Sequence, residues 1–215
     1  MRKFAVLLLA MFVVSAHADT VFNYDGFFAR MKKSEQPQYS EVTLTFVLQK
    51  QATIEPCQIE RARLTTDISD APLTLASNGE LILPYEKLFN DRKALIRLEQ
   101  QSGATPCDLN FRIRNKMPLN QSIRLKQLRI IHQQFDALLQ DLAGMGKYFL
   151  PSMTGITIQF SDDNHALVSS AAVQQAWRCE GRNCHLDLTK LAGESDEVEL
   201  TFSQDPEYLF PYIPR

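Results

Sequence analysis

The sequence predicts an α+β fold, made mostly of antiparallel β-sheet with one long amphipathic helix. Two observations support this prediction. Short stretches in which apolar and polar residues alternate, separated by turn signals, recur along most of the chain and are typical of half-buried strands. One longer stretch instead repeats its apolar residues with the period of an α-helix. Many strands combined with one isolated long helix indicate the α+β class.

The N-terminus has the pattern of a secretory signal peptide. Arg2 and Lys3 form a basic start, an apolar run extends from Phe4 to Val14, and Ala16-His17-Ala18 is a small-x-small cleavage site. The apolar run is shorter than the ~20 residues that a helix needs to span a bilayer. We therefore expect residues 1–18 to be a signal peptide cleaved after Ala18, and the remaining chain to be a soluble periplasmic protein.

Composition excludes several classes of protein. The formal net charge is −2 at pH 7, and loss of Arg2 and Lys3 with the signal peptide makes the mature chain more acidic, which argues against a nucleic-acid-binding protein. No second hydrophobic run approaches the length of a membrane span. With 45% hydrophobic residues, the chain is long enough to bury a core as one domain or two small ones.

The first part of the mature chain is predicted to be rich in strands. Asp25 can cap a short helix that continues to Lys33. Asn78-Gly79 predicts a hairpin, and Pro84 favours one helical turn over residues 84–89. Strands are expected at residues 41–49, 57–65, 73–75, 81–83, 94–99 and 107–114.

The second part begins with the long helix, predicted from Ile123 to Ala143 and ended by Gly144. One apolar stripe supports it, formed by Leu128, Ile131, Phe135, Leu138 and Leu142. Strands then follow at residues 155–160, 166–169, 173–179, 184–188 and 197–202. The aromatic tail from Tyr208 to Pro214 is expected to dock on the body of the protein, because a free apolar tail invites aggregation.

A weak internal repeat links the two parts. Residues 83–88 and the strand at 94–98 resemble residues 186–191 and the strand at 197–201. The repeat indicates either two related helix-plus-sheet units or a coincidence between short β-rich segments. The division of the chain that we predict is a β-rich unit at 19–120, a linking amphipathic helix at 121–147 that could belong to the second unit, and a β-rich unit at 148–215.

Four cysteines lie in the mature chain, and an even number in an exported protein favours disulfide bonds. We predict the pairs Cys57–Cys107, on two neighbouring strands, and Cys179–Cys184, across a hairpin tip. The run from Cys179 to His185 also resembles a covalent haem motif, in which Cys179 and Cys184 would form thioethers and His185 would bind the iron. A zinc site on the same three residues would lack a fourth ligand. We expect the disulfide, with Trp177 packed against it, and no cofactor or metal.

The sequence contains no recognisable catalytic motif: it lacks a G-x-S-x-G elbow, an H-E-x-x-H motif and a P-loop. His132, His165 and His185 are each isolated in the sequence. His132 and Asp136, four residues apart on the long helix, could support a metal or a proton relay, although a solvated helix flank is the ordinary interpretation. The sequence leaves open whether the protein is an enzyme.

Several short segments together resemble a known family: the leader, Tyr24 and Phe28, Cys57-x-Ile59, Leu83-Pro84-Tyr85-x-Lys87-Leu88, Cys107-Asp108-Leu109, and Trp177-x-Cys179 with Cys184-x-Leu186. The chain is similar, over nearly all of its mature length, to a domain-of-unknown-function family of exported proteins from aquatic gamma-proteobacteria. The resemblance implies a Gram-negative periplasm and assigns no activity or catalytic residue.

Three functions follow as hypotheses. The first is a non-enzymatic protein of the cell envelope that binds or scaffolds a partner, either an envelope protein or a small ligand. The second is an envelope hydrolase whose site is assembled only in the fold. The third is a covalent haem protein through Cys179, Cys184 and His185. The sequence does not define the oligomeric state.

Overall fold

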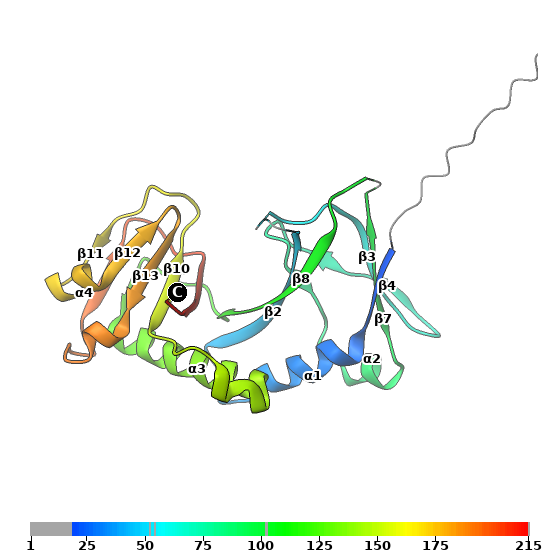
Figure 1. The fold of residues 1–215 in the computed structure, drawn as a ribbon, viewed down its shortest axis with the longest axis horizontal. Coiled ribbons are helices and arrows are strands. Elements are labelled where there is room, and N and C mark those ends of the chain that lie inside the picture. The colour runs from blue at the N-terminus through cyan, green and yellow to red at the C-terminus, as the bar shows by residue number, and fades with distance from the viewer. Residues whose placement is uncertain (1–18, 52, 54, 102, 215) are drawn as a thin grey trace, which may run out of the picture.

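The computed structural model describes residues 19–51, 53, 55–101 and 103–214. The fold is α+β and mostly antiparallel, as predicted, with two halves side by side along the long axis of the molecule (Figure 1). The predicted signal peptide lies outside the described residues. Within the described ranges, no helix is long and apolar enough to cross a membrane.

The first half contains two small antiparallel sheets and a hairpin. Its strands are β1 (Asp19–Asn23), β2 (Val42–Lys50), β3 (Ile59–Thr65), β4 (Asp70–Pro72), β5 (Thr74–Leu75), β6 (Leu81–Ile82), β7 (Leu95–Gln100) and β8 (Cys107–Asn115). Its helices are α1 (Tyr24–Ser34) and α2 (Lys87–Asp91). The strand orders are β1-β7-β3-β4, β2-β8 and β5-β6, and an isolated bridge between Val47 and Glu80 joins the hairpin to β2.

The second half begins with β9 (Ser122–Arg124), α3 (Leu125–Ala143) and the short 3-10 helix η1 (Gly144–Phe149). Its other elements are β10 (Gly155–Gln159), β11 (Leu167–Val168), α4 (Ala171–Ala176), β12 (Trp177–Glu180), β13 (Asn183–Asp187), η2 (Leu188–Leu191), β14 (Glu199–Phe202) and β15 (Tyr208–Tyr212). The strands form two sheets, in the orders β12-β13-β10-β15 and β11-β14-β9.

The two halves repeat one pattern of strand pairing. The pairs β1–β7, β3–β7, β2–β8 and β5–β6 of the first half correspond in chain order to β9–β14, β11–β14, β10–β15 and β12–β13 of the second. A backbone hydrogen bond from Leu48 to the carbonyl of Gly79 has its counterpart from Phe160 to the carbonyl of Arg182, both 2.9 Å long. The weak sequence repeat therefore coincides with a repeated arrangement of strands.

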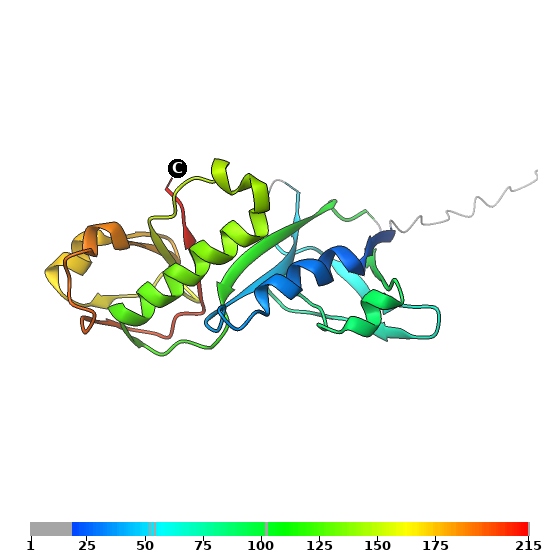
Figure 2. The ribbon, with the colours of Figure 1, turned by 90° about the horizontal axis from the view of Figure 1, so that it is seen from below.

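The long helix α3 packs against both halves. Its buried side chains are Leu125, Leu128, Ile131, Phe135 and Leu138, and it contacts β2 and β8 of the first half and β9, β10 and β15 of the second. It begins two residues later than predicted because residues 122–124 pair with β14. Figure 2 shows α3 and α1 along one side of the molecule, where together they cover both halves.

One predicted strand is partly helical. Residues 173–179 were expected to form a single strand, but residues 171–176 form α4, and only Trp177 to Glu180 are extended. The side chain of Ser170 accepts a hydrogen bond from the backbone of Val173, which is the N-cap arrangement that starts a helix. Trp177 stacks on Phe202, with ring centroids 5.8 Å apart.

The aromatic tail docks, as expected, and it does so as a strand. Residues 208–212 form β15, which pairs with β10, and Leu209 is buried. The buried side chain of Asn115, at the end of β8, accepts a hydrogen bond of 2.7 Å from the backbone of Leu209. The two halves are therefore tied together where β8 meets β15.

Both predicted disulfides are present, and the described residues contain no free cysteine. Cys57 precedes β3 and is bonded to Cys107, the first residue of β8, with a Cα–Cα distance of 6.0 Å. Cys57 is not part of β3: its backbone donates a hydrogen bond to Leu48 of β2, the partner of β8. The bond therefore links β8 to the segment before β3 and not, as predicted, two neighbouring strands.

Candidate functional site

A cleft of about 790 Å³ lies between the two halves. Strands β2 and β8 line it from the first half, and β10, the β12–β13 hairpin and β15 line it from the second. Leu139 and Leu142 of α3 also line it. Sites between two units are preferred positions for ligand binding, because groups from both can converge on one molecule.

Part of the cleft wall is apolar. Side chains alternate along β8, so Phe111 and Ile113 lie on one face of the strand and Arg112 and Arg114 on the other. Phe111 is 48% exposed. The apolar residues that line the cleft include Leu44, Val47, Phe111, Ile113, Leu139, Leu142, Leu150 and Phe210. Among them, Val47 lies on the face of the β2–β8 pair that carries Arg112, whereas Leu44, Phe111 and Ile113 lie on the opposite face.

One arginine of the cleft is fully paired. Arg114 donates to both carboxylate oxygens of Glu80, at 2.9 and 3.2 Å, and its guanidinium lies 5.1 Å from the ring centroid of Tyr208. The Glu80 side chain is 9% exposed and that of Arg114 is 21% exposed. This ion pair braces the wall and leaves no net charge there for a ligand.

Two other arginines of the cleft, Arg112 and Arg182, have no ion pair among the described residues. Arg112 of β8 is half-buried, and burial, followed by the positive charge of Arg182, lowers its pKa. Arg182 lies at the tip of the β12–β13 hairpin, on the opposite side of the cleft. Neither guanidinium has an ion pair or hydrogen bond within the described ranges. The acidic residues that line the cleft are Glu80, which is paired with Arg114, and Glu180, and neither forms an ion pair with Arg112 or Arg182 in the described part of the chain.

Equivalent positions of the two halves line the cleft with different side chains. Thr45 pairs with Arg112 across β2 and β8, and Thr157 pairs with Phe210 across β10 and β15. All four residues line the cleft. Equivalent pairings of the two halves therefore contribute a cation from one side and an aromatic ring from the other.

His185 lies in this cleft and not at the disulfide. Its Nδ1 is 2.9 Å from the hydroxyl of Thr157, and its ring stacks on Tyr212 at 4.4 Å. Burial lowers its pKa, and the charge of Glu180 acts in the opposite direction. Because neighbouring residues of a strand point to opposite faces, the side chains of His185 and Cys184 lie on opposite sides of β13.

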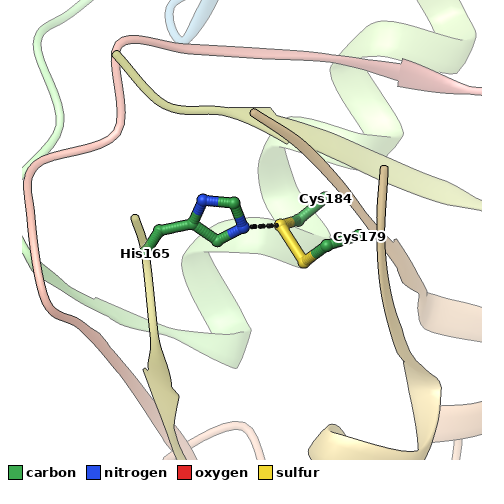
Figure 3. A group of neighbouring side chains, drawn as sticks. All are labelled: His165, Cys179 and Cys184. Atoms are coloured by element: carbon green, nitrogen blue, oxygen red, sulfur yellow. Dashed lines mark hydrogen bonds between the residues drawn. A yellow bond between two sulfur atoms is a disulfide. The ribbon is translucent and has the colours of Figure 1, made fainter. Parts of the chain in front are cut away.

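The histidine that contacts the Cys179–Cys184 disulfide is His165, and not His185 as the sequence suggested. Its Nε2 lies 2.8 Å from Sγ of Cys184, and the ligand atoms of His165, Cys179 and Cys184 all lie within 4.8 Å of one another. Figure 3 shows the ring directed at the disulfide. The disulfide takes up both thiols that covalent haem attachment would need, and His185 is on the other face of the strand, so these residues do not fit a haem.

His132 and Asp136 stay together on α3, away from the other two histidines. They line a separate hollow of about 600 Å³. Burial lowers the pKa of His132, and its Nε2 has no hydrogen-bond partner in the described part of the chain. Asp136 accepts a hydrogen bond from Gln140 at 2.7 Å.

Comparison with protein families gives one match. The sequence model of a family described as a protein of unknown function (DUF2987) matches residues 16–160. The chain belongs to this family. No curated protein and no solved structure matches it significantly. The DUF2987 match includes Arg112 and Arg114 but ends before the β12–β13 hairpin, which supplies Arg182 and His185.

Sequence reasoning missed the arginine pair of this DUF2987 protein. The available signal was the alternation from Asn110 to Arg114, which marks a strand with one polar and one apolar face. That signal does not show which distant segment the polar face meets. Arg182, far along the chain, reaches the cleft because the β12–β13 hairpin projects toward β8.

Proposed function

We propose that this protein is exported to the Gram-negative periplasm and that it binds, without catalysis, a small amphipathic anion in the cleft. The ligand has an apolar body and a carboxylate or phosphate group. The observation that carries the proposal is the half-buried guanidinium of Arg112, which lies near Arg182 and has no ion pair among the described residues.

An unpaired cation is costly to bury, and a second cation beside it adds repulsion. The pairing of Arg114 with Glu80 shows that the same cleft neutralises an arginine where the charge serves packing. Arginine binds carboxylate and phosphate groups bidentately, so an anion between Arg112 and Arg182 would relieve both costs. Val47, which shares a face of β2 with Thr45, and Phe210, which pairs with Thr157, would contact the rest of the ligand.

The test uses 8-anilinonaphthalene-1-sulfonate, a fluorescent aromatic anion. We expect saturable binding at one site, weakened about tenfold by Arg182→Gln and unchanged by Arg97→Gln, an exposed arginine of β7 outside the cleft. Decanoate and decyl phosphate should displace the dye, whereas decanol, which has the same apolar chain without charge, should not. Whichever of decanoate and decyl phosphate displaces the dye more strongly identifies the anionic group of the ligand as a carboxylate or a phosphate.

The dye could instead bind an exposed apolar surface at η1, where Met145, Tyr148 and Phe149 are 79–89% exposed. Phe149→Ser distinguishes the two positions. If this variant abolishes the signal and Arg182→Gln leaves it unchanged, the cleft proposal is wrong.

Replacing Arg112 should separate stability from binding. In Arg112→Met the half-buried charge and its repulsion with Arg182 are lost, so we expect the free energy of unfolding without ligand to rise by about 1 kcal/mol. Affinity for the dye should fall about tenfold in the same variant. Urea titration and dye binding measure the two effects. A loss of stability together with unchanged affinity would show that Arg112 serves the fold.

Export is supported by the leader pattern and by the two disulfides, which persist in oxidising compartments. N-terminal sequencing of the protein purified from a periplasmic extract should start at Asp19. Recovery of the chain in the cytoplasm with Met1 intact would contradict this part of the proposal.

A hydrolase is the second candidate, and one contact favours it. The hydroxyl of Thr157 lies 2.9 Å from Nδ1 of His185, the spacing of a nucleophile and its base. Burial lowers the pKa of His185, which favours the neutral ring that can accept a proton. Turnover of a p-nitrophenyl ester that disappears in Thr157→Val and falls as pH drops through this lowered pKa would favour this candidate over simple binding.

A further inference from the structure

The two sulfurs of the Cys179–Cys184 disulfide lie in different surroundings. The cysteines pair directly across β12 and β13. Cys184 is completely buried, whereas Cys179 is exposed. A thiol in solution therefore has access to the bond from the Cys179 side, and Cys184 is the sulfur that would leave.

The leaving sulfur has a titratable partner. Nε2 of His165 lies 2.8 Å from Sγ of Cys184, and Nδ1 lies 3.3 Å from the carbonyl oxygen of Asp162. A carbonyl only accepts, so Nδ1 carries the hydrogen and donates to it. The ring also stacks on Phe160 at 4.6 Å, with only 8° between the planes. These contacts hold Nε2 against the sulfur, as Figure 3 shows.

The other disulfide of the chain lacks both features. Cys57 is 7% exposed, and Cys107 is half-buried. Sγ of Cys107 accepts a hydrogen bond of 2.7 Å from the side-chain amide of Gln100, a group that does not take up a proton. The chain thus contains an internal reference: a second disulfide with a neutral donor and no exposed cysteine.

We propose that Cys179–Cys184 is a thiol-exchange site that accepts electrons from a dithiol, with His165 as its catalytic acid. A thiolate of the dithiol attacks Sγ of Cys179 and forms a mixed disulfide. The Cys179–Cys184 bond breaks, and its electron pair passes to Sγ of Cys184. The protonated ring of His165 donates its Nε2 hydrogen to this thiolate, which makes Cys184 a better leaving group.

The second thiolate of the dithiol then attacks its own sulfur in the mixed disulfide. This step releases the thiolate of Cys179, which takes a proton from water. The dithiol becomes a cyclic disulfide, and the protein disulfide becomes two thiols, so two electrons and two protons are transferred. The site does not depend on the ligand of the cleft.

The experiment is limited reduction of the intact protein by dithiothreitol, followed by alkylation and peptide mass mapping over time. Cys179–Cys184 should open at least about tenfold faster than Cys57–Cys107. In His165→Phe, which keeps an aromatic ring against Phe160 but removes both nitrogens, that rate should fall about tenfold. His132→Phe, a change of the same type on α3, should leave both rates unchanged.

The rate at Cys57–Cys107 also reports whether each variant is folded, because a loosened fold would speed its opening. If that rate rises in His165→Phe, the comparison is made with His165→Gln, whose neutral side-chain amide cannot act as an acid. Opening of Cys57–Cys107 first in the wild type, or an unchanged rate at Cys179–Cys184 in the folded His165 variant, overturns the proposal.

Discussion

The double variant Arg112→Gln/Arg182→Gln is expected to bind 8-anilinonaphthalene-1-sulfonate about 100-fold more weakly than the wild type. Each guanidinium would contribute a charge-assisted contact worth roughly 1.5–3 kcal/mol, and the two face one another across the cleft. Glutamine keeps hydrogen-bond donors at both positions, so the loss measures charge. Fluorescence titration at two salt concentrations measures the effect, and the wild type should show the steeper salt dependence.

The matched control is Arg61→Gln/Arg97→Gln. It removes the same number of charges from β3 and β7, in the sheet of the first half that does not line the cleft. Its affinity should stay within about twofold of the wild type, since distant surface charges are screened. Equal losses in the two double variants would mean that the dye senses net charge and not a site.

Gly155→Ala is expected to lower the free energy of unfolding by about 3 kcal/mol. Gly155 is the first residue of β10, the strand that pairs with both β13 and β15. A Cβ atom at this position would lie 1.9 Å from the carbonyl oxygen of Leu186, so β10 or β13 must move. Because both strands line the cleft, affinity for the dye should fall as well.

Gly193→Ala is the control for this substitution, because no atom lies within 4 Å of a Cβ built there. Chemical denaturation of both variants gives the comparison. We expect Gly193→Ala to stay within about 0.5 kcal/mol of the wild type. If Gly155→Ala were equally stable, the close approach of β10 and β13 would not be a property of the protein in solution.

Local patterns predicted the elements that have a regular apolar face. The alternation along residues 41–49 predicted β2, and the apolar stripe of residues 128–142 predicted α3. In both cases one face is buried against the core, and the spacing of side chains records this directly. The predicted start of α3 was less accurate. Ile123 is buried in β9, but its apolar side chain is equally compatible with the first turn of the helix.

The patterns were least informative where a few side-chain contacts decide the structure. Residues 173–179 alternate weakly, but the hydroxyl of Ser170 caps Val173 and starts α4 instead. The adjacency of Cys184 and His185 in the sequence suggested a joint site, yet in a strand adjacent side chains point apart. His165 reaches the disulfide from the segment before β11, a contact that no local pattern encodes.

The cleft was beyond prediction for a related reason. Arg112 and Arg182 come from different halves, and they face each other because α3, the β8–β15 contact at Asn115 and the repeated sheets set the halves side by side. The weak sequence repeat was compatible with two related units or with coincidence, and it contains no information on how two units would pack.

A crystal structure of the protein with bound 8-anilinonaphthalene-1-sulfonate tests the central claim most directly. We predict the sulfonate within hydrogen-bonding distance of both Arg112 and Arg182, with the rings of the dye against Val47 and Phe210. A dye molecule on the exposed surface at Met145, Tyr148 and Phe149, with the two arginines free of any anion, would contradict it.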